Sequence, residues 1–244
     1  RSLQIMSKAL YENLEGLRFW SEPQLKRREE IKNAIVHCVD DTIRGINQMW
    51  RSYQVETPLM MPMDKMSGTY TRDDVFVLMD PPGGTSQYGL RPETTNGTYE
   101  IAKSLIRSGS LRAPCCFYQM GPSFRRETSD GATAAKLRFN QFTQLEFQLI
   151  MSQDTKADLI TPLRNNLLSV VQRLLEREVR LVTSDRLPSY SIETIDIEAF
   201  ADNGEWREVA STSLRNDAPE IQGHKPLKNI ELAFGMDRLV LLSE

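Results

Sequence analysis

The chain has 244 residues, of which 40% are hydrophobic and 26% are charged, and its formal net charge is −3. This composition suits one large globular domain, or a domain with a small appendage, and its slight acidity argues against a broad basic surface for nucleic acid. No apolar run approaches the roughly 20 residues of a membrane-spanning helix, and three cysteines are too few for a disulfide framework or a zinc site, so we expect a cytoplasmic protein with no membrane partner.

The first long element that the apolar pattern predicts is a helix from Leu25 to Trp50, preceded by an N-terminal extension over residues 1–24. Ser21 is a suitable N-cap for a helix, and Pro23 fits a first helical turn. Apolar residues recur at helical spacing on one stripe: Ile31, Ile35, Val39, Ile43, Ile46 and Trp50.

Two short strands and a second helix follow. The segment Tyr53–Leu59 is predicted to be a strand, and Pro58 confines it to a sheet edge or a strand end because proline lacks a backbone N–H. Val75–Leu78 reads as a short apolar strand. The pair Thr94-Thr95 can cap a helix that runs to about Ile106.

In the second half of the chain, the pattern of apolar residues predicts more strands and a long helix. Cys115–Met120 and Phe139–Ile150 are expected to pair as an antiparallel hairpin around the polar loop 129–136. A helix over Lys156–Arg177 and three further strands follow: Ser191–Ala199, Trp206–Ser213 and Ile230–Phe234. This order predicts an α+β fold, in which helices flank an antiparallel sheet. Glycine-rich dinucleotide and P-loop motifs are absent from the sequence.

The last strand leads into a helix at Gly235, and Arg238 falls in the first turn of that helix. A cation there opposes the helix dipole, because the N-terminus already carries partial positive charge. A bound anion would reverse this penalty, since backbone amides and a guanidinium can hold one phosphate together. Alternatively, Arg238 pairs with a carboxylate or points into water. A second arginine–carboxylate cluster, Phe124–Glu127, favours the anion.

A nucleoside triphosphate needs cations for its phosphates, carboxylates for its magnesium, and an apolar face with a polar edge contact for its base. The sequence offers a candidate for each need: Arg125 and Arg238 for phosphate, Glu208 and Glu231 for Mg²⁺, Phe142 for stacking and Glu127 for the base amino group. Each also has an ordinary structural alternative. Arg125 and Glu127 could form an ion-pair network on one strand face, Phe142 could belong to the core, and the two other glutamates could be solvated.

Three segments resemble the three signature motifs of class II aminoacyl-tRNA synthetases, and they occur in the same order. Residues 25–60 are similar to motif 1, which in that family forms a helix and strand at the dimer interface. Residues 119–148, with Phe124-Arg125-Arg126-Glu127, resemble motif 2, and residues 229–242, with Gly235-Met236-Asp237-Arg238, resemble motif 3. The resemblance implies a class II catalytic domain over residues 25–244.

Within this class, the chain is most similar to glycyl-tRNA synthetases. Leu90–Gly97 resembles the segment that lines the amino-acid pocket of that family, Glu146 stands at the position of a pocket glutamate, and Trp206-Arg207-Glu208 resembles its tryptophan-x-glutamate strand. The resemblance implies that four residues bind the amino acid: Arg91, Glu93, Glu146 and Glu208. For ATP, it implies the following roles: Arg125 on the α-phosphate, Glu127 on the adenine edge, Phe142 on the adenine face, Arg238 on the γ-phosphate and Glu231 on Mg²⁺.

The proposed amino-acid pocket also makes electrostatic sense. Three carboxylates that converge on a small space repel one another unless a cation joins them, and an α-ammonium group supplies that cation. Alternatively, Glu93, Glu146 and Glu208 never meet. The sequence departs from the glycyl family at Asn140-Gln141, where arginine and glutamate are usual, and at Ala233, where serine is expected.

Together these features predict ATP-dependent activation of a small amino acid, glycine by resemblance, to an aminoacyl-adenylate, with transfer to tRNA. Two alternatives stay open: a paralogue that uses another acceptor, and a non-catalytic binding or dimerisation subunit. The sequence runs from Arg1 to just past Arg238, so we expect no anticodon-binding domain in it, and it leaves open whether the chain is a fragment. We expect a homodimer through the Ile31–Ile46 stripe and the Pro58 strand, unless the stripe packs on its own sheet.

Overall fold

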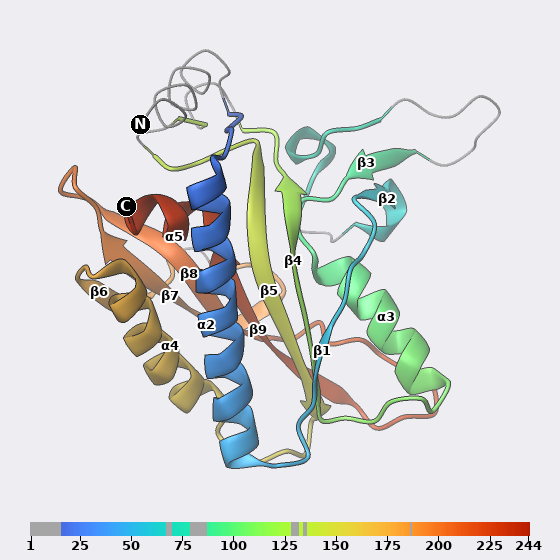
Figure 1. Ribbon diagram of the computed structural model, residues 1–244. Helices are drawn as coiled ribbons and strands as arrows, with labels where there is room; N and C mark the ends of the chain where they lie inside the picture. The colour runs from blue at the N-terminus through green and yellow to red at the C-terminus, as the bar shows by residue number, and fades with distance from the viewer. Residues whose placement is uncertain (1–15, 67–69, 79–86, 128–131, 134–135, 186) are drawn as a thin grey trace.

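A computed structural model describes residues 16–66, 70–78, 87–127, 132–133, 136–185 and 187–244 (Figure 1). Its helices and strands are α2 (Glu22–Ile46), β1 (Ser52–Gln54), β2 (Met60–Pro62), β3 (Tyr88–Leu90), α3 (Thr95–Arg107), β4 (Cys115–Phe124), β5 (Gln141–Ser152), α4 (Ile160–Leu175), β6 (Val179–Thr183), β7 (Ser191–Phe200), β8 (Trp206–Arg215), β9 (Leu227–Gly235) and α5 (Met236–Leu242). Short 3-10 turns cover Met63–Lys65 and Arg72–Asp74.

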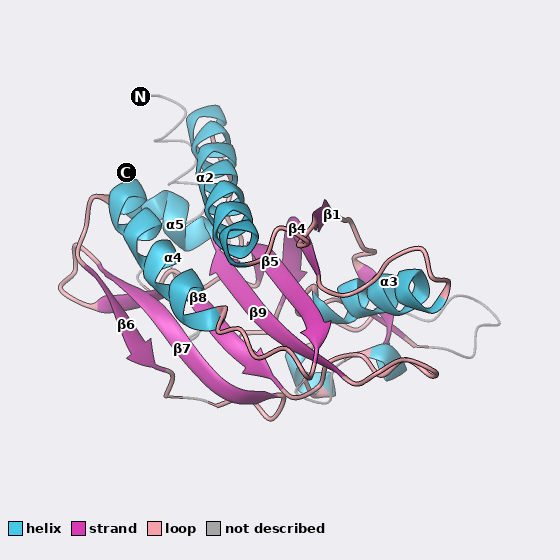
Figure 2. Cartoon of the chain, turned by 90° about the horizontal axis from the view of Figure 1, so that it is seen from below, coloured by secondary structure: helices cyan, strands magenta, loops and turns pink. Residues whose placement is uncertain are grey.

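Seven strands form one sheet in the order β1-β4-β5-β9-β8-β7-β6, and β2 pairs with β3 in a small separate sheet. Neighbouring strands of the large sheet are antiparallel, except that β1 and β4 run parallel. Helices α2, α4 and α5 lie together on one side of this sheet (Figure 2). The predicted α+β class, an antiparallel sheet flanked by helices, is confirmed.

Helix α2 begins near its predicted start because Ser21 and Gln24 form a capping box, in which the Ser21 N–H donates to Gln24 Oε1 over 3.0 Å. It ends at Ile46, so the buried Trp50 follows the helix rather than belonging to it. The apolar stripe is fully buried against α4, α5 and the sheet, at Ile31, Ile35, Val39 and Ile43. The stripe therefore packs on its own sheet, and the expectation that it forms a dimer interface is wrong.

Side chains alternate across the central strands, as extended backbone requires. On β5, Leu145, Phe147 and Leu149 belong to the core beneath the helices, whereas Glu146 and Gln148 point to the opposite face. Strand β9 repeats this pattern. The sheet face away from α2, α4 and α5 is therefore lined by carboxylates, amides and hydroxyls.

The edge strands differ most from the predictions. The predicted strand 53–59 is limited to β1, and the chain continues past Pro58 to β2, because a proline cannot donate a ladder hydrogen bond. Val75–Leu78 is not a strand, and it meets β3 through one bridge between Val77 and Gly89. Strand β6 was not predicted at all.

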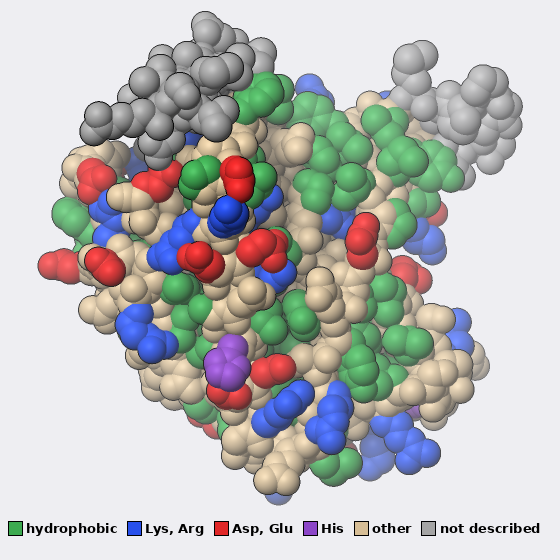
Figure 3. Space-filling model, in the orientation of Figure 1, with side chains coloured by type: hydrophobic (Ala, Val, Ile, Leu, Met, Phe, Trp, Pro, Cys, Tyr) green, Lys and Arg blue, Asp and Glu red, His purple; other side chains and the backbone are tan. Residues whose placement is uncertain are grey.

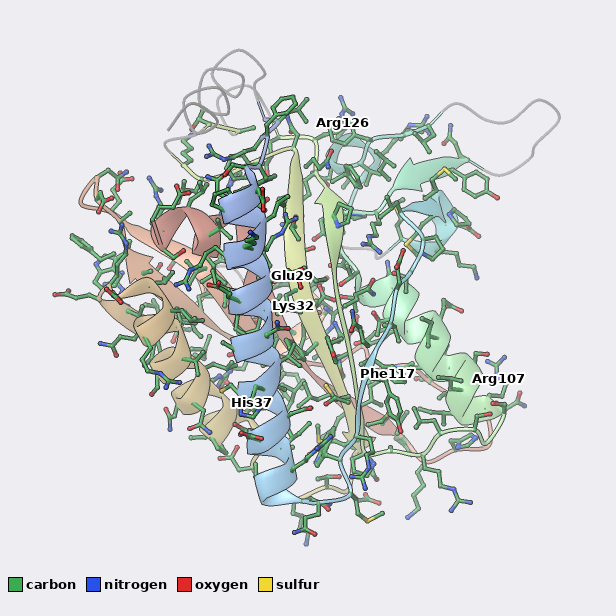
Figure 4. All side chains as sticks on the ribbon, in the orientation of Figure 1. Glu29, Lys32, His37, Arg107, Phe117 and Arg126 are labelled. Carbon is green, nitrogen blue, oxygen red and sulfur yellow. The ribbon has the colours of Figure 1, made fainter. Side chains whose placement is uncertain are left out.

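Helix α3 and the small sheet lie beyond β4 and complete the molecule on that side. Ala102 and Ile106 of α3 pack in one hydrophobic cluster with Phe117 of β4. Figure 4 shows Phe117 between β4 and α3. Thr94, one of the two predicted caps, is the N-cap residue of α3, although its side chain makes no capping hydrogen bond, and the predicted end near Ile106 is confirmed. None of the described helices is long and apolar enough to cross a membrane.

Two predicted segments lie partly outside the described residues. Of the extension over 1–24, only residues 16–24 are described, and α2 already begins at Glu22 within it. Of the polar loop 129–136, only 132–133 and 136 are described.

Candidate functional site

A cavity of about 480 Å³ opens on the polar face of the sheet, over β5, β8 and β9. It is lined by the predicted site residues with the exception of Arg91: Glu93, Arg125, Glu127, Phe142, Glu146, Glu208, Glu231 and Arg238. Arg125 and Arg238 lie 113 positions apart in the chain, and they face the same space.

Arg125 follows β4 directly and is held by several contacts. Its Nε–H donates to the carbonyl of Pro92 over 3.2 Å. Its guanidinium carbon lies 5.1 Å from the centre of the Phe142 ring and 5.4 Å from the centre of the Tyr70 ring. These contacts keep the charge in place at the cavity wall, where an anion could meet it without reorganisation of the side chain.

Arg238 lies in the first turn of α5, as predicted. Its Nε donates to the carbonyl of Leu137 over 2.9 Å, and its Nη1 donates to the carbonyl of Glu208 over 2.6 Å. Burial lowers the pKa of Arg238 from its usual range. Its Nε and Nη1 thus donate to backbone carbonyls, and among the described residues no ion pair joins Arg238 to a carboxylate.

Glu127 and Phe142 lie close to Arg125. The backbone N–H of Glu127 donates to Asn140 Oδ1 over 2.8 Å, which ties the two ends of the β4–β5 connection together. The Glu127 carboxylate is 3.8 Å from Arg138, a weak contact that leaves it accessible to a ligand. Phe142 is half-buried on β5, so one part of its ring is open to the cavity.

Another part of the cavity gathers three buried carboxylates, Glu93, Glu146 and Glu231. Gln148 Nε2 donates to Glu146 over 2.8 Å and to Glu231 over 2.9 Å, and the Thr95 hydroxyl lies within hydrogen-bond distance of both. Burial raises the pKa of Glu93 to about 8 and that of Glu146 to about 7, and repulsion from Glu231 adds to both shifts. This part of the cavity therefore favours a cation.

Arg215 supplies one positive charge to these buried carboxylates through an ion pair with Glu231. Its Nη1 lies 2.5 Å from Glu231 and its Nη2 lies 2.7 Å from Asp217, while the Tyr190 ring centre is 3.7 Å from its guanidinium carbon. The side chain is buried, and burial of a charge requires such pairing. Arg215 was not among the predicted site residues, although its two-residue spacing from Ser213 places both on one face of β8.

Glu208 was predicted to join the buried carboxylates, but it lies elsewhere in the cavity. Ser213 is the cross-strand neighbour of Glu231, and Glu208 comes five residues earlier on β8, which is roughly 16 Å of extended backbone. Its carboxylate is near the guanidinium groups of Arg125 and Arg238. The group of three buried carboxylates therefore contains Glu231, whereas the sequence predicted Glu208 as its third member.

The two predicted metal ligands are separated by the same stretch of β8. Glu208 and Glu231 lie in different parts of the cavity, and Glu231 Oε2 already accepts hydrogen bonds from Arg215 and Gln148. Within the described ranges, no group of three or more His, Cys, Asp or Glu residues could hold a metal ion by itself.

Arg91 is the predicted site residue that the structure places outside the cavity lining. Its Nε donates to the carbonyl of Pro122 and its Nη1 donates to the carbonyl of Thr57, both over 2.9 Å. A Cβ at Gly121 would meet the Arg91 guanidinium at 2.7 Å, so the packing is tight. Arg91 therefore ties β4 to the segment after β1, and the expectation that it binds the amino acid is wrong.

Comparison with known proteins agrees with this arrangement. The family model of the tRNA synthetase class II core domain (G, H, P, S and T) matches residues 76–223, which is more than half of the chain. The chain belongs to this family. It is 27% identical over 214 residues to a glycine–tRNA ligase of Clostridium tetani, covering 84% of this chain and 40% of the relative. A glycine–tRNA ligase of Lachnospira eligens is 26% identical over 224 residues, covering 88% of this chain and 42% of the relative.

Solved structures show the same fold. The prolyl-tRNA synthetase of Cryptosporidium parvum, complexed with halofuginone and AMPPNP, matches with a TM-score of 0.72 at 15% identity, over 95% of this chain and 48% of that chain. The prolyl-tRNA synthetase of Giardia lamblia, in complex with prolyl-adenylate, matches with a TM-score of 0.72 at 13% identity, over 94% of this chain and 48% of that chain. The class II catalytic-domain architecture is thus confirmed, and the chain spans about 40% of the length of the glycine–tRNA ligases named above.

Proposed function

We propose that this chain activates glycine with ATP, forming glycyl-adenylate and releasing pyrophosphate. The observation that carries the proposal is one cavity in which Arg125 and Arg238 lie together with the buried group of Glu93, Glu146 and Glu231. Guanidinium groups suit a triphosphate, and carboxylates suit an α-ammonium group. The class II core family supports the same chemistry, and the similarity to glycine–tRNA ligases favours glycine.

In this proposal Arg125 contacts the α-phosphate and Arg238 the γ-phosphate, while Phe142 stacks on adenine and Glu127 accepts a hydrogen bond from its amino group. The substrate carboxylate is already ionised at pH 7, so it attacks the α-phosphorus without a protein base. As the bond to pyrophosphate breaks, the arginines hold the reactants in line and stabilise the charge on the phosphate oxygens.

The buried carboxylates receive the substrate ammonium. Because burial raises the pKa of Glu93 and of Glu146, a bound ammonium favours their ionised forms, and binding releases protons. Arg215 offsets part of the negative charge and holds Glu231 in position through their ion pair.

Mg²⁺ would reach the cavity with ATP, because proteins bind this ion through one or two carboxylates together with the nucleotide phosphates. Glu208 fits this role, since it lines the same cavity as Arg125 and Arg238, and its charge acts on both guanidinium groups. Glu231 is the other predicted ligand, but its Oε2 is paired with Arg215, which leaves its Oε1 for such a contact. When bound, Mg²⁺ supplies positive charge to the phosphates.

We further propose that tRNA accepts the activated amino acid and that the chain forms a homodimer. The family match and the names of the relatives support tRNA. Because the stripe of α2 is buried, we propose the β1 edge as the dimer interface, since among the described strands β1 pairs only with β4. Exposed hydrophobic side chains gather near β1 and β2, at Met49, Tyr53, Leu59 and Met60 (Figure 3).

Amino-acid-dependent ATP–pyrophosphate exchange tests the activation step. With a panel of the standard amino acids, we expect exchange with glycine, followed by charging of bulk tRNA. Exchange without charging would favour a paralogue that uses another acceptor. Exchange with none of the amino acids would contradict the proposal and favour a non-catalytic subunit.

A further inference from the structure

Two tyrosines that the sequence did not single out line the cavity beside the buried carboxylates. Tyr70 precedes the short turn Arg72–Asp74, and Tyr190 lies in the connection between β6 and β7. They come from segments far apart in the chain, and both side chains are half-buried. Neither belongs to the sheet that carries Glu146 and Glu231.

Each tyrosine ring rests on one of two arginines. The Tyr70 ring centre is 5.4 Å from the guanidinium carbon of Arg125, and the Tyr190 ring centre is 3.7 Å from that of Arg215. Both arginines are themselves fixed, Arg125 by the Pro92 carbonyl and Arg215 by its ion pairs. A guanidinium attracts the face of an aromatic ring, so both rings are held against arginines that are themselves fixed.

The two rings line the same cavity as Glu93 and Glu231, and Arg215, against which Tyr190 rests, is paired with Glu231. Burial raises the pKa of both phenols, and the charges of Glu93 and Glu231 raise it further. Tyr70 adds to the shift of Tyr190. Both rings therefore border the cavity that a substrate ammonium would enter to meet these carboxylates.

We propose that Tyr70 and Tyr190 form the wall that sets the size of the amino-acid subsite, admitting glycine and excluding α-amino acids that carry a side chain. This inference rests on the proposed function. An ammonium held by Glu93, Glu146 and Glu231 puts the α-carbon of the substrate against the two rings. A methyl group on that carbon must displace a braced ring, and tightly packed sites resist such displacement.

Selectivity in ATP–pyrophosphate exchange tests this wall. The quantity to measure is kcat/KM for alanine divided by kcat/KM for glycine, at saturating ATP, in wild type, Tyr70→Ala and Tyr190→Ala. We expect each variant to raise this ratio at least about tenfold, since one methyl group is worth about 10- to 200-fold in a fitted pocket. Tyr88→Ala, on β3 and outside the cavity lining, is the matched control and keeps the wild-type ratio.

Two further variants protect the test against misfolding. Tyr70→Leu and Tyr190→Leu keep an apolar side chain but remove the ring, and we expect them to raise the ratio as well. An unchanged ratio in folded variants that still exchange with glycine would overturn the size wall and leave the proposed function intact. Absence of exchange in the wild type would overturn both.

Discussion

Glu93 is only 5% exposed, and its Oε1 has no hydrogen-bond partner among the described residues. Burial raises its pKa from 4.5 to about 8, with Glu146 and Glu231 adding to the shift and Arg215 opposing it. Between these two pH values the folded chain holds a proton that the unfolded chain has lost. The contribution of Glu93 to folding stability therefore falls as the pH rises through this window.

Glu93→Gln should remove this pH dependence, because glutamine is neutral and similar in shape. The unfolding free energy of the variant relative to wild type should increase from pH 5 to pH 8, by up to about 1.4 kcal/mol per pH unit. Urea denaturation at several pH values measures it, and Glu220→Gln, at an exposed position, controls for the loss of a charge. A difference that stays constant with pH would contradict the burial of an ionisable Glu93.

At the level of single residues, the sequence predicted those that a family motif marks and missed those that depend on register. Arg125 and Arg238 stand in motifs, and both face the cavity. Arg215 belongs to no predicted set, because its ion pair with Glu231 depends on how β8 and β9 align. Arg91 stands in a motif-like segment, but a motif does not specify whether a side chain turns toward the cavity or into the protein.

Among the elements, the central strands and the long helices were predictable because each has a clear hydrophobic period. The antiparallel pair β4–β5 is an example, since its register brings Cys115 opposite Ile150 in the core. The edge strands were less predictable, because β1 and β2 have only three residues each and their pairing is set by tertiary contacts. The apolar stripe predicted helix α2 correctly. The stripe alone could not show whether the chain's own sheet or a second copy of the chain covers it.

The β1 edge provides an element-scale prediction about the dimer. Met60 of β2 is 58% exposed and belongs to the exposed hydrophobic group proposed for the interface, so Met60→Lys should place a charge there and convert the dimer to a monomer at micromolar concentration. Leu187→Lys is a matched control, because Leu187 is 59% exposed but lies in the β6–β7 connection. Light scattering gives the masses, and a wild-type mass of one protomer would contradict the dimer.

The whole molecule brings together groups that local pattern cannot place. Arg125 lies at the end of β4 and Arg238 in α5, and only the order of strands in the sheet, with β5 and β9 between β4 and β8, makes them face one cavity. Family resemblance predicted this convergence, whereas composition and periodicity did not. The phosphate role of both arginines depends on this convergence.

Equilibrium titration with ATP tests the convergence most directly, in wild type, Arg125→Ala, Arg238→Ala and Arg126→Ala. Arg126 is the matched control because it is exposed near the end of β4 (Figure 4) and lies outside the cavity lining. The first two variants should lose at least about tenfold in ATP affinity, since a hydrogen bond to a charged group contributes about 1.5–3 kcal/mol, while Arg126→Ala should bind like wild type. Wild-type affinity in a folded Arg125→Ala or Arg238→Ala variant would contradict a shared triphosphate site.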